Sequence, residues 1–323
     1  MTGASGFVGV HLLEALVACG IETTALHFSS KPHDSSDRNE LITWVRADLT
    51  SEDIDHYLPE IEVIFHLAGY SGLGADRDTV KRLNDINVLA TERVATAALK
   101  ADCRLVYVSS VSAGDAADEQ TVVDETNGLP LTEYGRSKRR AEKILESLGC
   151  QGLDFTILRP TQLFGEYHRG SVYELVRAIQ RRHFFLIGDG KNATNFYYIK
   201  DFVQVLLSVA ENVAAHNNIY ICADIPVPLG TLVEEISAHL NTSLRDMKIS
   251  REFGMLLGGF CDVVEEHLRI NLPLTRQRVR AMTRDVRYSN QKFAKDIGKV
   301  ASHGTLAGLA RTIEWYRSSG LLK

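Results

Sequence analysis

The sequence predicts an α/β protein, in which a doubly wound parallel sheet is followed by a smaller, mostly helical part. Two observations support this prediction. Short β-branched or apolar runs alternate with amphipathic helical patterns through the first half of the chain, which is typical of successive βαβ units. A glycine-rich turn also opens the first helical pattern, as in parallel sheets that bind a ligand at their carboxyl edge.

The bulk composition is that of an ordinary globular protein. The 323 residues include 36 Lys and Arg against 41 Asp and Glu, so the net charge is −5 and no positive field attracts nucleic acid or an anionic membrane. No apolar run reaches the roughly 18 residues of a membrane span, and no signal-peptide pattern opens the sequence. We therefore predict a cytoplasmic protein with a small-molecule substrate, and with neither nucleic acid nor membrane as a partner.

The cysteines and histidines argue against a disulfide framework and against a metal site. The five cysteines are scattered and never form a Cys-x-x-Cys pair, which is typical of reduced thiols in a cytosol. The eleven histidines show no metal-ligand spacing. We expect no metal.

The first element is a glycine-rich turn with the helix that follows it. Glycines stand at positions 3, 6 and 9, and apolar residues near helical spacing continue to Gly20. Such glycines let the backbone approach a pyrophosphate, whose charge then lies against the helix N-terminus. Unless this is a plain glycine-rich turn, it predicts a dinucleotide site with these cofactor-binding residues: Gly3, Ser5, Gly6, Phe7, Val8 and Gly9.

Only Met1 and Thr2 precede this turn, although it should follow a central strand of about five residues. The loss of a middle strand would leave the backbone edges of two neighbouring strands unpaired. We therefore expect that the sequence begins late relative to the complete product. If the product does begin at Met1, we expect reduced stability and reduced cofactor affinity.

The second predicted strand, residues 21–28, leads to a segment that bears on the choice between NAD and NADP. NAD-binding versions of this arrangement place Asp or Glu here, where it binds the ribose 2′-hydroxyl. This chain instead has Ser29, Ser30 and Lys31. Hydroxyls and a cation suit a 2′-phosphate better, so the segment favours NADP, unless it is a solvated turn.

Three more strands and a helix follow in the expected alternation. The strands are predicted over residues 43–47, 63–67 and 104–108, and the helix over 85–99. The carboxyl ends of parallel strands are where ligands bind in such sheets. The residues at or just after these ends are Asp48, Leu49, Leu67, Ala68, Gly69, Ser109 and Ser110.

A polar segment then leads into a helix that carries Tyr134 and Lys138. Four residues apart on a helix, their side chains share one face and lie roughly 6 Å apart along the axis. Since a nearby ammonium favours the phenolate, we expect Lys138 to lower the pKa of Tyr134 from its ordinary value of about 10. A phenol tuned in this way can exchange a proton with an alcohol or a ketone near neutral pH. With eleven tyrosines in the chain, such a pair can also arise by chance.

The rest of the chain divides into two predicted domains. A strand over residues 155–158 should end at Arg159-Pro160, because proline cannot donate to the ladder. Residues 219–222 look like one more strand of the same sheet. We assign residues 1–163 to a dinucleotide-binding domain, rejoined by about 194–223, and residues 164–323 to a substrate-binding domain.

Taken together, these segments resemble the extended short-chain dehydrogenase/reductase family, in its NAD-dependent epimerase/dehydratase group. The resemblance implies a Rossmann-type fold. Each motif is short, but the set follows the family's order from residue 2 to about 202. The matching pieces are Thr2-Gly3-x-x-Gly6-x-x-Gly9, Asp48-Leu49, His66-Leu67-Ala68, Asn87-Val88, Val108-Ser109-Ser110, Tyr134-Gly135-Arg136-Ser137-Lys138, Leu158-Arg159-Pro160, Gly188-Asp189-Gly190 and Tyr198-Ile199-x-Asp201-Phe202.

The resemblance implies roles for single residues. Tyr134 would be the catalytic acid/base, and Lys138 would lower its pKa and hold the nicotinamide ribose. A serine at the end of the fourth strand would bind the reacting oxygen; we assign this role to Ser110, with Ser109 as the alternative. For Asn87, a loop-bracing role and a site role are both open. The remaining cofactor contacts would be Asp48 and Leu49 at the adenine, Leu67, Ala68 and Gly69 at the phosphates or ribose, and Pro160 and Thr161 at the carboxamide.

Two departures from the family pattern limit the range of expected reactions and substrates. Dehydratases of this group place an acidic pair after the catalytic Ser or Thr, whereas Val111-Ser112 stand here, so we do not expect 4,6-dehydration. Many members that act on sugar nucleotides carry an Arg near residues 192–195, which read Asn-Ala-Thr-Asn in this chain.

Three functions remain open at this point. We predict an NAD(P)-dependent epimerase or oxidoreductase that acts at a secondary alcohol carbon, in the first place of a nucleotide sugar. The second is an NADPH-dependent ketoreductase or dehydrogenase resembling the 3β-hydroxysteroid and dihydroflavonol group. The third is a non-catalytic NAD(P)-binding regulatory module. The resemblance also implies a homodimer, for which the alanine-rich helix over residues 85–99 is suited.

Overall fold

The computed structural model describes residues 1–28, 39–58, 60–72, 74–115, 122–242, 248–268, 275–298, 300 and 302–322. Ser29, Ser30 and Lys31, on which the expectation of NADP depended, lie outside the described residues. Within them, no helix is long and apolar enough to cross a membrane.

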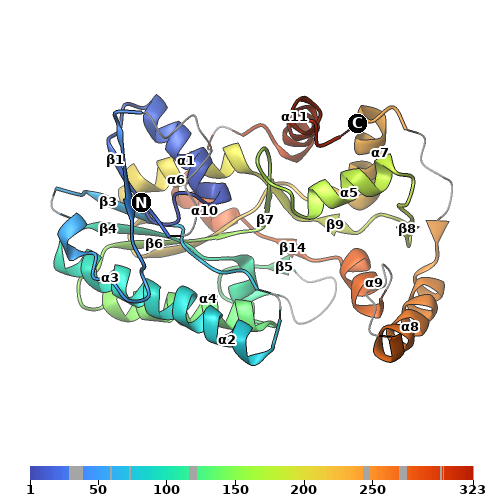
Figure 1. The fold of residues 1–323 in the computed structure, drawn as a ribbon, viewed down its shortest axis with the longest axis horizontal. Helices are drawn as coiled ribbons and strands as arrows, with labels where there is room; N and C mark the ends of the chain where they lie inside the picture. The colour runs from blue at the N-terminus through green and yellow to red at the C-terminus, as the bar shows by residue number, and fades with distance from the viewer. Residues whose placement is uncertain are drawn as a thin grey trace.

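A parallel sheet forms the larger part of the molecule (Figure 1). Its strands are β1 (Thr23–His27), β2 (Ile42–Arg46), β3 (Val63–His66), β4 (Arg104–Val108), β6 (Phe155–Pro160) and β11 (Asn218–Cys222). The order β3-β4-β6-β11 is continuous, and β2 pairs with β1. Thr2 joins the two groups, because it forms parallel bridges with Leu26 of β1 and His66 of β3. The predicted α/β class with a doubly wound parallel sheet is confirmed.

Helices cover both faces of this sheet (Figure 1). On one face lie α2 (Arg77–Asn84), α3 (Ala90–Lys100) and α4 (Glu133–Gly149); on the other lie α1 (Phe7–Ala18), α6 (Ile199–Glu211) and α10 (Gln291–Asp296). The middle strands are apolar at successive positions because both of their faces are buried. In β4, for example, Leu105, Val106 and Tyr107 are each wholly buried.

The other elements are short strands and the helices of the carboxyl-terminal part. The helices are α5 (Ser171–Gln180), α7 (Leu229–His239), α8 (Arg251–Leu268), α9 (Arg276–Thr283) and α11 (Thr305–Ser318). The strands are β5 (Val122–Val123), β7 (Gln162–Phe164), β8 (Leu186–Ile187), β9 (Ala193–Thr194), β10 (Phe196–Tyr198), β12 (Val227–Pro228), β13 (Lys248–Ile249) and β14 (Arg287–Tyr288). In Figure 1, α5, α7, α8 and α9 lie to one side of the parallel sheet.

Two expected boundaries were wrong. The helix predicted over residues 85–99 starts at Arg77, runs through a π-helical turn at Asp85–Leu89 and continues as α3. Its start is explained by Asp76, whose side chain caps the helix by accepting from the backbone N–H of Thr79. The strand predicted to end before Pro160 includes that residue, because its ladder with β11 runs two residues beyond its ladder with β4.

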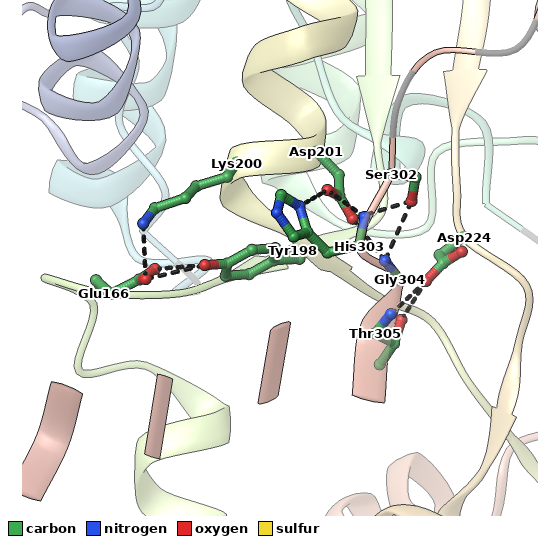
Figure 2. Close-up of polar contacts among 9 residues, drawn as sticks. All are labelled: Glu166, Tyr198, Lys200, Asp201, Asp224, Ser302, His303, Gly304 and Thr305. Atoms are coloured by element: carbon green, nitrogen blue, oxygen red, sulfur yellow. Dashed lines mark hydrogen bonds and ion pairs between the residues drawn. The ribbon is translucent and has the colours of Figure 1, made fainter. Parts of the chain in front are cut away.

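A polar cluster fixes the loop before α11 to the sheet domain (Figure 2). The buried carboxylate of Asp201 accepts hydrogen bonds from Ser302 Oγ at 3.0 Å, from the backbone N–H groups of His303 and Gly304 at 2.8 and 2.9 Å, and lies 2.7 Å from His303 Nδ1. Next to it, Glu166 accepts from the Tyr198 hydroxyl at 2.9 Å and pairs with Lys200 at 3.0 Å. The Tyr198-Ile199-x-Asp201 motif therefore holds the carboxyl-terminal helix in place.

Candidate active site

The glycine turn has the geometry of a phosphate cradle. Gly3 has φ of +67°, and a Cβ there would lie 2.6 Å from the backbone nitrogen of Ala68. A Cβ on Gly9 would lie 2.4 Å from the carbonyl oxygen of Gly3. Helix α1 begins just after Gly6, and among the described residues no side chain caps it and its first turn holds no acidic residue. A helix N-terminus approached by bare backbone fits the pyrophosphate of a dinucleotide.

The segment Leu67–Gly69 lies beside this turn and is held there by a buried histidine. His66 Nδ1 lies 2.6 Å from the Thr2 hydroxyl, and its Nε2 lies 2.9 Å from the hydroxyl of Thr91. Thr2 Oγ1 also accepts from the backbone N–H of Ala68 at 3.3 Å. Burial lowers the pKa of His66 to about 3, so the ring is neutral and acts as a hydrogen-bonding strut.

Asn87 braces the next stretch of chain. This buried side chain donates to the carbonyl of Tyr70 at 2.9 Å and to Ser137 Oγ at 2.9 Å, and it accepts from the Tyr70 N–H at 2.7 Å. It thereby ties the loop after Gly69 to α4. Of the two roles that the sequence left open for Asn87, these contacts support loop bracing.

Helix α4 is placed by a cap and by one close contact. The Thr132 hydroxyl caps it by accepting from the Gly135 N–H at 3.0 Å. A Cβ on Gly135 would lie 2.1 Å from the carbonyl oxygen of Ser112, so only glycine lets the helix approach the 3₁₀ turn Val111–Gly114 this closely. This approach brings Tyr134 to the end of β4, where the side chain of Ser110 is near enough to lower the pKa of the phenol.

The expected lowering of the Tyr134 pKa was wrong for this structure. Burial raises the pKa of Tyr134, and the neighbouring Ser110 side chain lowers it by a smaller amount. Lys138 is itself buried, and its Nζ donates to the Val108 carbonyl at 3.0 Å and lies 4.9 Å from the centre of the Tyr107 ring. Burial lowers the pKa of Lys138 to about 8. The pKa values of Tyr134 and Lys138 therefore depend more on their burial than on their spacing along the helix.

The two candidate serines point in different directions. Ser109 is buried, and its hydroxyl donates to Glu142 Oε1 at 2.7 Å. Glu142 in turn forms a buried ion pair with Arg159, at 2.7 and 2.8 Å. Ser110 is the one that the structure brings to Tyr134.

The other predicted cofactor residues lie along the same edge of the sheet. Asp48 follows β2, and hydrogen bonds from the Thr50 hydroxyl at 2.7 Å and its N–H at 2.9 Å hold the pKa of the carboxyl below its usual range. Leu49 is half-buried beside it.

Gly69 is close to Lys138, since a Cβ on Gly69 would lie 3.2 Å from Lys138 Nζ. Pro160 ends β6, and Thr161 donates its backbone N–H to the Cys222 carbonyl at 3.0 Å.

A cavity of about 460 Å³ adjoins this edge, next to Val111 and Thr161. Arg284 also lines the cavity and donates to both oxygens of Asp115 at 3.0 and 3.2 Å. Many family members that act on sugar nucleotides carry an Arg near residues 192–195; the arginine beside this cavity is Arg284 instead. Asn192 and Asn195 instead hold the segment around Arg284, by donating to the carbonyls of Met282 and Val286 at 3.0 and 2.7 Å. No motif marked Arg284, since it lies about 90 positions further along the chain.

No metal site emerges from the described residues, which contain no group of three or more His, Cys, Asp or Glu side chains that could hold a metal ion.

Comparisons with known proteins identify the family. Residues 1–223 match the model of the NAD dependent epimerase/dehydratase family. The chain is 28% identical to N-acetyl-alpha-D-glucosaminyl-diphospho-ditrans,octacis-undecaprenol 4-epimerase of Escherichia coli O157:H7, over 98% of this chain and 94% of that protein. It is 25% identical to 2-alkyl-3-oxoalkanoate reductase of Stenotrophomonas maltophilia, over 96% of this chain and 97% of that protein. The solved structure of MoeE5 in complex with UDP-glucuronic acid and NAD superposes with a TM-score of 0.76 at 25% identity, over 98% of each chain. The chain therefore belongs to the NAD-dependent epimerase/dehydratase family of enzymes.

Proposed function

We propose that this enzyme is an NAD-dependent 4-epimerase of a sugar carried as a diphosphate ester, in the first place a nucleotide sugar. The observation that carries the proposal is the placement of Tyr134 beside Ser110 at the carboxyl edge of the sheet, on the helix that also brings Lys138 close to Gly69. Relatives support the choice of reaction, because the Escherichia coli protein is a 4-epimerase of a sugar diphosphate and MoeE5 holds UDP-glucuronic acid with NAD.

The residues present fit NAD, whose nicotinamide would supply the acceptor and donor of the hydride. The glycine turn and the N-terminus of α1 would bind its pyrophosphate, and Lys138 with Gly69 would bind the ribose. NAD is also the nucleotide of the family and of the MoeE5 complex, so the NADP that Ser29, Ser30 and Lys31 favoured finds no support in the comparisons.

At the substrate, Tyr134 would take the hydroxyl proton as the alcohol is oxidised and return it as the ketone is reduced. Ser110 would hold the same oxygen. The neighbouring Ser110 side chain favours the phenolate that this step requires, against the larger opposing effect of burial.

We assign the diphosphate of the substrate to Arg284. Arg284 lines the same cavity as Thr161, and arginine binds phosphate oxygens in a bidentate manner. Asp115, which holds Arg284 in this structure, would keep the side chain oriented toward the cavity.

The test is a substrate panel. The purified protein is denatured to release and identify any bound nucleotide, and is then incubated with UDP-glucose or UDP-N-acetylglucosamine, with the 4-epimer measured by NMR. We expect retained NAD and a 4-epimer.

The second candidate is a reductase, favoured by the full-length match to 2-alkyl-3-oxoalkanoate reductase and by the absence of Arg at residues 192–195. It predicts that a small ketone oxidises NADPH in the presence of the protein while UDP-sugars stay unchanged. That result would replace the epimerase proposal.

A further inference from the structure

The aromatic ring of Tyr107, in strand β4, lies beside the amino group of Lys138. The Nζ atom of Lys138 is over this ring, 4.9 Å from its centre. Tyr107 is wholly buried and Lys138 is only 4% exposed, so the pair is shielded from bulk water. An aromatic face within about 6 Å of a cation attracts it, and the attraction is stronger when the pair is desolvated.

The surroundings of Nζ leave donors for a ligand. Nζ donates to the carbonyl of Val108 at 3.0 Å, which takes one of the three donors of an ammonium. Gly69, at the proposed ribose site, is also close, since a Cβ there would lie 3.2 Å from Nζ. A ring face attracts the charge as a whole and does not take up a donor as a carboxylate does. The contact with Tyr107 is therefore compatible with hydrogen bonds from Lys138 to ribose hydroxyls.

Glu142 is an acidic group near the lysine, one turn further along α4. It raises the pKa of Lys138, against the larger lowering by burial. Its carboxylate, however, accepts hydrogen bonds from two guanidinium groups, those of Arg139 at 3.0 Å and Arg159 at 2.7 and 2.8 Å. Much of its charge is therefore balanced by the arginines. The ring of Tyr107 makes the direct contact that a carboxylate makes in an ordinary ion pair.

The titratable groups around this pair, His66 of β3 and Tyr134 of α4, are uncharged at neutral pH. His66 stacks on Tyr107, with ring centres 5.5 Å apart and planes at 23°. Burial lowers the pKa of His66 to about 3, and it raises the pKa values of both tyrosines. The ammonium of Lys138 therefore meets a neutral histidine and two neutral phenols.

We propose that Tyr107 is a positioning residue, whose ring face holds the ammonium of Lys138 in its charged form next to the ribose site at Gly69. The inference rests on the role proposed above for Lys138 in the epimerase. Tyr107 acts only through the lysine, because its own side chain is enclosed in the core. The ring offsets part of the cost of burying a charge at this position.

The test varies the charge distribution of the ring at nearly constant shape. Tyr107→Phe is made first, and phenylalanines with one, two and three ring fluorines are then introduced at position 107 by amber suppression. Fluorine withdraws electron density from the ring face and so weakens its attraction for a cation. The pKa of Lys138 is measured by NMR on the full chain labelled with ¹³C,¹⁵N-lysine. Its signal is assigned by its absence from Lys138→Met.

We expect Tyr107→Phe to keep the pKa of Lys138 at its wild-type value, because the ring remains. The fluorinated rings should lower it stepwise, with a decrease of at least about 0.5 for the trifluorinated ring. The pH above which kcat/KM falls should decrease by the same amount. A purely structural role of the ring predicts a constant pKa along the series.

Tyr220 of β11 provides a matched control. It is also buried, and its ring has the Nζ of Lys292 at 4.0 Å from its centre, away from the candidate active site. The same fluorinated series at position 220 should leave the pKa of Lys138 unchanged.

Three results would overturn the inference. They are a constant pKa of Lys138 along the series at position 107, a decrease in Tyr107→Phe as large as with the trifluorinated ring, and an equal decrease from the series at position 220. The NMR titration does not depend on epimerase activity. A negative substrate panel would therefore refute the proposed function alone, and a constant pKa in an active epimerase would refute this inference alone.

Discussion

At the scale of single residues, the site depends on which way two adjacent serines point. Successive side chains after a strand turn to opposite sides, so Ser109 reaches the buried Glu142 and Ser110 reaches Tyr134. The sequence predicted that one of the two is catalytic. It could not show which of the two faces Tyr134, because their orientation depends on Glu142 and Arg159, which are distant in sequence.

We predict opposite effects for the two alanine variants. Ser110→Ala should lower kcat/KM about 10- to 100-fold, because a contact to the reacting oxygen is lost. It should change the free energy of unfolding by no more than about 1 kcal/mol, because the hydroxyl accepts one hydrogen bond, from the Ser112 N–H at 3.2 Å. Ser109→Ala should destabilise the fold by about 1–3 kcal/mol, because it removes a hydrogen bond from a buried carboxylate. Urea titration and steady-state kinetics measure both, and the reverse pattern would transfer the role to Ser109.

The charge of Lys138 leads us to predict that activity depends on pH. The pKa of Lys138 is lowered from 10.5 to about 8, so its ammonium is present below pH 8 and is lost as the pH rises through that value. Since that ammonium would hold the nicotinamide ribose, kcat/KM should fall above about pH 8. Lys138→Met should show a low rate without this alkaline limb. A wild-type rate that stays constant to pH 10 would contradict the assignment.

At the scale of elements, the approach of α4 to the turn after β4 assembles the site. Gly135 allows this close approach, since a Cβ at this position would lie only 2.1 Å from the carbonyl oxygen of Ser112. The Tyr-Gly-Arg-Ser-Lys motif therefore encodes packing as well as chemistry.

We predict that Gly135→Ala destabilises the protein by about 1–3 kcal/mol and lowers activity, because the helix must move away from the turn. Arg136→Ala, at the exposed neighbouring position, is the control and should change the free energy of unfolding by less than about 0.5 kcal/mol. Thermal melts and the epimerase assay check both variants. Equal stability and equal activity of the two variants would show that the close contact at Gly135 does not position the helix.

Much of the arrangement of helices and strands could be predicted from the sequence, because strand ends and helical faces follow from periodicity over a few residues. The positions of Tyr134, Ser110 and the glycine turn could be predicted in this way. The pKa of Tyr134 could not, because its burial comes from distant segments. The role proposed for Arg284 could not be predicted for the same reason, because its place in the cavity depends on contacts with residues about 90 positions earlier.

At the scale of the whole molecule, one argument for a homodimer has to be corrected. The alanines of α3 that suited close packing, Ala95, Ala97 and Ala98, are buried against the sheet. The exposed side of this helical run instead carries Leu89, Glu92 and Arg93.

A homodimer nevertheless remains our prediction from the family resemblance. Light scattering should then give about twice the chain mass of 35.9 kDa. A charge-reversing Arg93→Glu variant should shift the equilibrium toward the monomer if this side of α3 is the interface. A wild-type mass of one chain at micromolar concentration would contradict the prediction.

The central claim is that Tyr134 moves only the hydroxyl proton while the carbon-bound hydrogen travels as a hydride. The most direct measurement is epimerisation of a UDP-sugar in D₂O, followed by NMR, with the wild type and with Tyr134→Phe. The account predicts a 4-epimer that keeps hydrogen at C4, and a rate at least about 100-fold lower for the variant. Deuterium at C4, or a variant as fast as the wild type, would contradict it.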